Sequence, residues 1–277
     1  MGTLKDVSLR NRLSRRQIGS GLLATAASIC LPAAASAAVD KESRKSGTFV
    51  LVPGAFHGGW CYGRTAKLLR DRGHIVFTPT LSGLAERAHE FSGNINLSTH
   101  IEDVVNLIRV EQLNQVVLCG HSYGGMVITG IGSTIAEKIA AIVYLDAFLP
   151  SDNQSLFDII GPEGRQRFLD SAGKLGGIGV APFTAEYMRV NEGDRAWVDR
   201  LCTKHPIATF IEKVNSTSAV EHIPRKHYIM AENFGFQWAF DKIKDRPGWT
   251  RETVKCGHDV MIDDPGFLAN RLESLLA

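Results

Sequence analysis

Short apolar runs recur along the chain, each followed by a segment with helical features. Predicted strands lie over residues 48–52, 75–77, 115–119, 140–145, 226–231 and 250–256. A run without polar alternation is typical of a strand that is buried on both faces of a parallel sheet. Helices are predicted around Leu68, over 101–110 with Thr99 and Glu102 as a capping box, over 237–243 and over 265–276.

This alternation predicts a three-layer α/β fold with a mostly parallel sheet flanked by helices. The pattern breaks between about residues 151 and 224, where aromatic residues are scattered among helical segments and Gly-rich turns without a clear strand. We expect this segment to be a largely helical cap, inserted after the strand that ends near Asp146, which covers the active site and supplies an apolar pocket. The alternative is that these helices pack on the core away from the site.

Residues 1–37 have the features of an export signal. Several arginines precede an apolar stretch over 18–32, and Ala-Ser-Ala follows at 35–37, as at a signal cleavage site. The pair Arg15-Arg16 predicts the twin-arginine type, with cleavage after Ala37 or Ala38 and a periplasmic or secreted mature domain over 38–277. A stable membrane anchor is the less favoured alternative, because the stretch is short and interrupted by Gly, Ser and Thr.

Composition narrows the choice of partners. The chain has 277 residues, of which 44% are hydrophobic, so it can bury one large core as a single domain. Its formal charge of +2, without a Lys/Arg cluster beyond the N-terminus, argues against a nucleic-acid partner and favours a small-molecule substrate. The cysteines after the signal show no metal-ligand spacing, and neither a disulfide nor the oligomeric state follows from the sequence.

The most informative motif is Gly-x-Ser-x-Gly at residues 120–124, between a predicted strand and a predicted helix. In this context the turn raises the serine hydroxyl above the sheet, and Gly120 and Gly124 remove the side chains that would collide there. Ser122 is therefore the candidate nucleophile. The alternative is an ordinary serine in a Gly-rich loop.

A serine hydroxyl needs a base, and the base needs a carboxylate to hold it. His258 is the only histidine after the last predicted strand, so it is the candidate base. Two acids are possible, because Asp146 ends the fourth predicted strand and Glu232 follows the fifth. Asp146 is preferred and Glu232 is the alternative.

The oxyanion that forms during attack on a carbonyl needs two backbone N–H donors. The amide of Tyr123, directly after the nucleophile, is one candidate, and Ala55 in the loop after the first strand is the other, with Phe56 as the runner-up. The expected reaction is acyl transfer to Ser122 followed by hydrolysis. It requires neither a metal nor an organic cofactor.

Three stretches together make the chain resemble the α/β-hydrolase superfamily: residues 52–60, 120–125 and 256–258. The His-Gly-Gly-Trp of the first loop and the segment 144–150 resemble the branch of plant methylesterases, hydroxynitrile lyases and related bacterial esterases. The resemblance implies the triad and the oxyanion amides of Ala55 and Tyr123. Asp259 stands where a lyase carries lysine, and Gly54 where it carries threonine, so both departures argue against a lyase.

The favoured function is a carboxylesterase that acts on a small ester with an apolar part. Hydrolysis of an amide, carbamate or lactone would use the same residues. A hydroxynitrile lyase and a binding protein without catalysis are the remaining alternatives.

Overall fold

The computed structural model describes residues 46–276, and its centre is one parallel sheet. The strand order is β10-β9-β4-β3-β1-β2, and every neighbouring pair is parallel. The predicted α/β architecture is confirmed. The strands are β1 (Thr48–Val52), β2 (Ile75–Phe77), β3 (Val116–His121), β4 (Ile139–Leu145), β9 (Arg225–Ala231) and β10 (Trp249–Val254).

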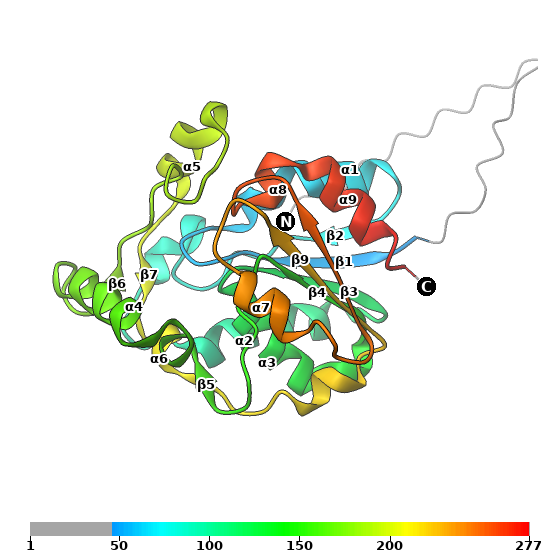
Figure 1. The fold of residues 1–277 in the computed structure, drawn as a ribbon, viewed down its shortest axis with the longest axis horizontal. Coiled ribbons are helices and arrows are strands. Elements are labelled where there is room, and N and C mark those ends of the chain that lie inside the picture. Colours follow the sequence, from blue (N-terminus) through cyan, green and yellow to red (C-terminus); the bar gives the residue numbers. More distant parts are fainter. Residues whose placement is uncertain (1–45, 277) are drawn as a thin grey trace, which may run out of the picture. The chain divides into compact units, whose positions relative to one another are not determined.

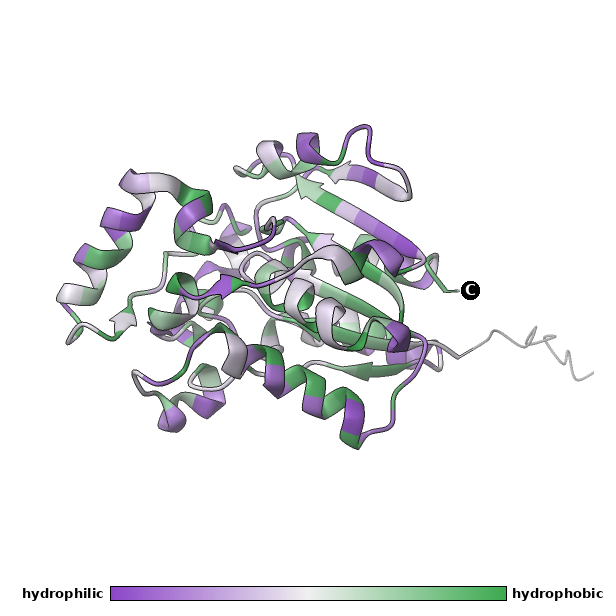
Figure 2. Ribbon diagram, turned by 90° about the horizontal axis from the view of Figure 1, so that it is seen from below, coloured by the Kyte–Doolittle hydropathy of each residue, from purple (hydrophilic) through white to green (hydrophobic). Residues whose placement is uncertain are grey.

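Helices cover both faces of the sheet (Figure 1). One face carries α1 (Gly63–Asp71), α8 (Val260–Asp263) and α9 (Pro265–Glu273); the other carries α2 (Leu97–Val110), α3 (Gly124–Ile135) and α7 (Gln237–Lys242). A hydrophobic core lies on each side of the sheet, and alternate residues of β1 point into one or the other. Val50 and Val52 pack with α2 and α3, whereas Phe49 and Leu51 pack with α1 and α9. Figure 2 shows the resulting hydrophobic strands in the middle of the sheet. Burial on both faces explains the unbroken apolar runs.

Some element boundaries differ from the sequence prediction. Helix α2 begins at Leu97 because Asn96 caps it, with the Asn96 side chain accepting from the Thr99 N–H and the Thr99 hydroxyl accepting from the Asn96 N–H. The predicted capping box of Thr99 and Glu102 is therefore wrong, since Thr99 already lies inside the helix. Strand β10 ends at Val254 rather than 256, and helix α9 ends at Glu273 rather than 276.

The cap lies between β4 and β9, at the end of the sheet toward which the strands point (Figure 1). Its helices are α4 (Leu156–Gly173), which is kinked at Gly161, α5 (Arg195–Leu201) and α6 (Ala208–Ile211). The sequence predicted no strand here, yet β5 (Gln154–Ser155) pairs with β8 (Lys213–Val214) and β6 (Gly179–Val180) pairs with β7 (His205–Pro206). Strands of two residues are too short to leave a hydrophobic period.

Short 3₁₀ helices complete the described part of the chain: η1 (Gly59–Tyr62), η2 (Ala85–Glu90), η3 (Ala136–Lys138), η4 (Glu192–Asp194) and η5 (Ser218–His222). The predicted export signal over 1–37 and its cleavage site lie outside the described residues. Within 46–276, none of the helices is both long and apolar enough to cross a bilayer.

Candidate active site

A cavity of about 770 Å³ lies between the cap and the carboxyl ends of the strands. Ligand sites of open α/β sheets are expected at this edge. Ser122 and His258 both line the cavity, as do Ala55 and Tyr123. Most of the remaining wall is apolar or aromatic and includes Phe148, Leu156, Phe168, Phe183, Phe210, Phe234, Phe236 and Trp238.

The turn after β3 holds Ser122 in a left-handed conformation, with φ of 52°. The Ser122 N–H donates to the Leu145 carbonyl, and the Ser122 carbonyl accepts from Gly125 and Phe148. A side chain at Gly120 would lie 2.6 Å from the Gly124 carbonyl oxygen, and one at Gly124 would lie 2.9 Å from the carbonyl oxygens of the β1 end. Both glycines are therefore required by close approach of the backbone. The arrangement is a nucleophile elbow.

His258 follows β10 and contacts Asp146 through Nδ1, at 2.6 Å from Oδ2. The other carboxylate oxygen of Asp146 accepts from the Ala231 N–H at 3.0 Å, and its side chain is fully buried. Burial raises the pKa of Asp146 in spite of the hydrogen bond from His258. Phe234 stacks on the imidazole with ring centroids 4.2 Å apart. The ring is thus oriented, and Nε2 has no hydrogen-bond partner within residues 46–276.

Glu232 lies elsewhere. Its side chain is exposed and accepts from the Thr253 hydroxyl at 2.6 Å. Of the two carboxylates that the sequence left open, the structure therefore brings only Asp146 to His258.

The hydrogen bonds of the loop after β1 decide between Ala55 and Phe56 as the candidate donor to an oxyanion. The Phe56 N–H donates to Nδ1 of His205, at 3.2 Å, so it is occupied. No hydrogen bond within 46–276 engages the N–H of Ala55 or of Tyr123. A Cβ at Gly54 would lie 2.9 Å from Cβ of Ser122, which shows how closely this loop passes the nucleophile. Ala55 and Tyr123 thus offer two free N–H groups beside Ser122.

The comparison with family models matches residues 49–271 to the alpha/beta hydrolase family. The chain belongs to this family. A carbendazim hydrolyzing esterase of Nocardioides sp. (strain SG-4G) is 42% identical over 240 residues, which cover 82% of this hydrolase and 98% of the relative. Methylesterase 1 of Arabidopsis thaliana is 32% identical over 117 residues, or 41% of this chain and 44% of the relative.

Solved structures show the same fold. An extracellular alpha/beta-hydrolase from a Paenibacillus species superposes with a TM-score of 0.74 at 24% identity, covering 83% of this chain and 99% of that one. The sequence relatives place the hydrolase in the esterase branch that its motifs resemble.

Sequence reasoning missed a second group of buried polar side chains in the hydrolase site, of which His57 and His121 border the cavity. His57 and Asp259 form an ion pair, with Nε2 and Oδ2 3.1 Å apart, and both are sealed from solvent. His121 donates from Nε2 to the His258 carbonyl at 3.0 Å. His205, in the cap, holds the Phe56 N–H. The one available signal was that Asp259, next to the candidate base, stands where a hydroxynitrile lyase carries lysine, and spacing could not reveal its partner.

No group of His, Cys, Asp and Glu side chains within the described residues could hold a metal ion. The cysteines in this part, Cys61, Cys119, Cys202 and Cys256, are all unpaired. Burial raises the pKa of Cys119 to about 12, which keeps its thiol protonated.

Proposed function

We propose that this hydrolase is a serine carboxylesterase with Ser122 as nucleophile, His258 as general base and Asp146 as the acid that orients it. The observation that carries the proposal is the 2.6 Å contact of Asp146 with His258, both in one site with the elbow serine. Among the three side chains, His258 Nε2 and Ser122 Oγ have no hydrogen-bond partner within residues 46–276, so they are available for proton transfer.

The reaction follows from these positions. Ser122 Oγ attacks the ester carbonyl carbon while its proton passes to His258 Nε2, and the carbonyl oxygen becomes an oxyanion that accepts from the Ala55 and Tyr123 N–H groups. His258 then gives the proton to the departing alcohol oxygen, which leaves an acyl-enzyme. Water, deprotonated by His258, attacks the acyl carbon; the bond to Ser122 Oγ then breaks, His258 returns the proton to Oγ, and the acid leaves.

The substrate is a small ester with an apolar, preferably aromatic, part. Rings from both the cap and the sheet side line the cavity, so a flat apolar group can be buried on either side of the ester. The identity to a carbendazim hydrolyzing esterase favours a carbamate ester as the second candidate substrate, since the same attack and leaving steps apply. An amide or lactone has no such support.

Active-site labelling tests the proposal. A fluorophosphonate should label the wild-type enzyme and the Ser133→Ala control, because Ser133 lies on α3 away from the cavity, but not Ser122→Ala. A panel of p-nitrophenyl esters, aryl methyl carbamates including carbendazim, amides and lactones then defines the bond. Ser122→Ala should lose at least about 10⁴-fold in kcat. Wild-type enzyme that neither labels nor hydrolyses any panel member would overturn the proposal.

We further propose export through a twin-arginine signal, as the pattern of residues 1–37 indicates. The exported protein should begin at Ala38 or Val39. Replacing Arg15 and Arg16 by lysine should keep the protein inside the cell. An exported protein that begins before Ala33 would contradict this proposal.

A further inference from the structure

The peptide unit between Ala55 and Phe56 is held at both of its polar ends by histidines. Its carbonyl accepts from His57 Nδ1 at 2.8 Å, and its N–H donates to His205 Nδ1 at 3.2 Å. The next residue, Phe56, has a φ of 71°, which is unfavourable for a side chain of this size. The conformation of this loop therefore depends on contacts from outside the loop.

His57 is itself anchored by Asp259. A carbonyl oxygen can only accept, so Nδ1 carries a proton, and Nε2 lies 3.1 Å from a carboxylate oxygen. Both ring nitrogens thus face acceptors, which favours the imidazolium form. Burial, the largest single influence, lowers the pKa of His57, but the charge and hydrogen bond of Asp259 and the nearby Cys202 together outweigh it, and the pKa is raised well above its usual value.

Other roles for Asp259 do not fit its contacts. It precedes α8, yet its side chain makes no capping hydrogen bond. Nδ1 of the adjacent His258 is already bound by Asp146. The second oxygen, Oδ1, has no hydrogen-bond partner and lies 3.6 Å from His121 Nε2. The main contact of this buried carboxylate is therefore His57.

We propose that His57 and Asp259 form a positioning pair that orients the Ala55–Phe56 peptide and, through it, the Ala55 N–H that binds the oxyanion. The inference rests on the proposed esterase function and adds two residues to it. Neither residue acts on the substrate's ester bond itself. The pair acts by fixing a donor before the oxyanion forms, which is the condition for electrostatic stabilisation without reorganisation.

The decisive variant is Asp259→Asn, which keeps the side-chain volume and removes the charge. A neutral imidazole has one N–H, so His57 can keep its bond to the Ala55 carbonyl only as an uncharged ring whose Nε2 accepts from residue 259, and the charge-assisted hydrogen bonds that fix the ring are lost. We expect kcat to fall about 10²-fold while KM stays near the wild-type value, because a misplaced donor weakens the transition state more than substrate binding.

The affinity for a trifluoromethyl ketone tests this role, because a residue that only maintains the fold would not change that affinity selectively. Ser122 adds to its carbonyl carbon, its proton passes to His258, and the resulting oxyanion occupies the same donors as the transition state. Its affinity for Asp259→Asn should fall in parallel with kcat/KM, whereas the affinity of a substrate-like ketone without fluorine should change little. A drop in kcat with unchanged trifluoromethyl ketone affinity would overturn the inference, as would wild-type values for both.

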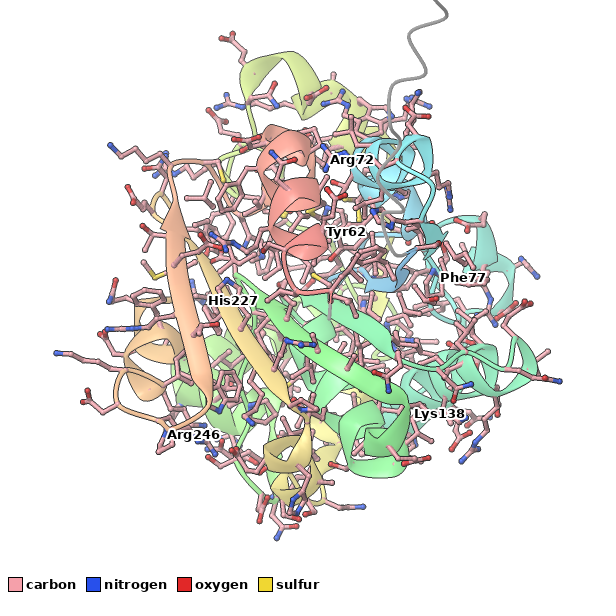
Figure 3. The ribbon with its side chains drawn as sticks, turned by 90° about the vertical axis from the view of Figure 1, so that its right-hand side faces the viewer. Tyr62, Arg72, Phe77, Lys138, His227 and Arg246 are labelled. Carbon is pink, nitrogen blue, oxygen red and sulfur yellow. The ribbon has the colours of Figure 1, made fainter. Side chains whose placement is uncertain are left out.

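Two further variants serve if Asp259→Asn folds poorly. His57→Asn can still donate an amide hydrogen toward the Ala55 carbonyl and should retain more kcat than His57→Ala; equal losses would contradict the proposal. The matched control is Glu252→Gln, which removes the carboxylate that lies 2.9 Å from Nε2 of the buried His227. His227 lies on β9 (Figure 3), and neither residue lines the cavity. Its kcat/KM should stay at the wild-type value.

The outcomes separate this inference from the proposed function. If wild-type enzyme neither labels with fluorophosphonate nor hydrolyses esters, the function fails. If wild-type enzyme is active and Asp259→Asn matches it, only the inference fails.

Discussion

Two histidine–carboxylate pairs lie next to each other in this hydrolase, and both histidines border the cavity. In the pair that we call open, a ring nitrogen has no partner among the described residues, whereas in the sealed pair both ring nitrogens are bonded. His258 and Asp259 are neighbours in the chain, yet His258 pairs with Asp146 and Asp259 pairs with His57. In the open pair the second ring nitrogen is free at the cavity. In the sealed pair the second nitrogen donates to the Ala55 carbonyl. The partner of the second nitrogen, rather than the carboxylate, is what separates the proposed base, His258, from the proposed anchor, His57.

The two pairs also differ in how burial and their partners shift the pKa of the carboxylate. Burial raises the pKa of Asp146, with one histidine and one backbone N–H opposing it. Burial also acts to raise the pKa of Asp259. The charge and hydrogen bond of His57, and to a smaller extent the charge of His121, nevertheless hold this pKa well below its usual value. The sealed pair is therefore a standing ion pair, whereas the open pair can gain its charge during the reaction. The predictions below test this contrast.

The largest effect should come from the open pair. Asp146→Asn should lower kcat by about 10⁴-fold, because the amide no longer stabilises the His258 imidazolium or selects its tautomer. Steady-state ester hydrolysis measures this, and circular dichroism checks the fold. Glu232→Gln is the control, since Glu232 contacts Thr253 at the surface, and it should keep wild-type kcat. A comparable loss in Glu232→Gln would contradict the assignment of Asp146.

The free energy of unfolding should depend more on the sealed pair than on the open pair, the reverse of the order expected for kcat. His57→Ala leaves the Asp259 carboxylate buried without its cation, which should cost about 3–5 kcal/mol of unfolding free energy. His258→Ala should cost only about 1–2 kcal/mol, because the raised pKa of Asp146 lets the carboxyl take up a proton and keep its bond from Ala231. Urea unfolding compares the two variants. Equal losses would show that the pairs do not differ in charge.

The pH dependence of stability sharpens the contrast. The raised pKa of His57 means that its contribution is complete below its unfolded pKa, about 6.5, and is lost as pH rises through the folded value. The lowered pKa of Asp259 means that its contribution is complete above about 4 and is lost as pH falls. The groups that face His57 are Asp259, Cys202 and His121.

Wild-type enzyme should therefore exceed Asp259→Asn in stability most between about pH 4 and 6.5, and the difference should shrink as pH rises from there through the folded pKa of His57. Urea unfolding of both proteins at several pH values measures it. A difference that does not change with pH would contradict an ionised pair.

The open pair could be predicted from the sequence because it depends on strand ends. Parallel strands bring their carboxyl ends to one edge, so Ser122, Asp146 and His258 were all expected there once their strands were recognised. The choice between Asp146 and Glu232 stayed open, because both follow a strand. It depends on the direction of a side chain, which only the folded backbone supplies.

The sealed pair could not be predicted. His57 and Asp259 are 202 positions apart, and a lone histidine near a pocket is indistinguishable from one that packs in the core. The cap was anticipated by its irregular pattern, but its two-residue strands were not. One of these, β7, carries His205 to Phe56, so the cap side of the oxyanion loop was also hidden.

The smallest effect on kcat should come from replacing His205, which holds the loop after β1 from the cap. His205 is neutral, because burial lowers its pKa well below the usual value, and it holds Phe56 through one ordinary hydrogen bond. His205→Phe keeps a ring that can stack on Phe210, whose ring centroid lies 4.5 Å from that of His205. It removes the acceptor of the Phe56 N–H, together with the contact of His205 Nε2 with the Thr209 hydroxyl at 2.9 Å. Loss of a neutral hydrogen bond worth about 1 kcal/mol should lower kcat about fivefold, well below the effect of Asp259→Asn.

Because His57 and His205 hold opposite ends of one peptide unit, their effects should not add. Once Asp259→Asn has weakened the hold on the carbonyl end, the remaining bond to His205 orients the Ala55–Phe56 peptide less well, and its removal should cost less than in wild-type enzyme. The double variant Asp259→Asn/His205→Phe measures this in kcat and in trifluoromethyl ketone affinity. Strict additivity would show that the two histidines act on separate parts of the site, and that the sealed pair does not work through the Ala55–Phe56 peptide.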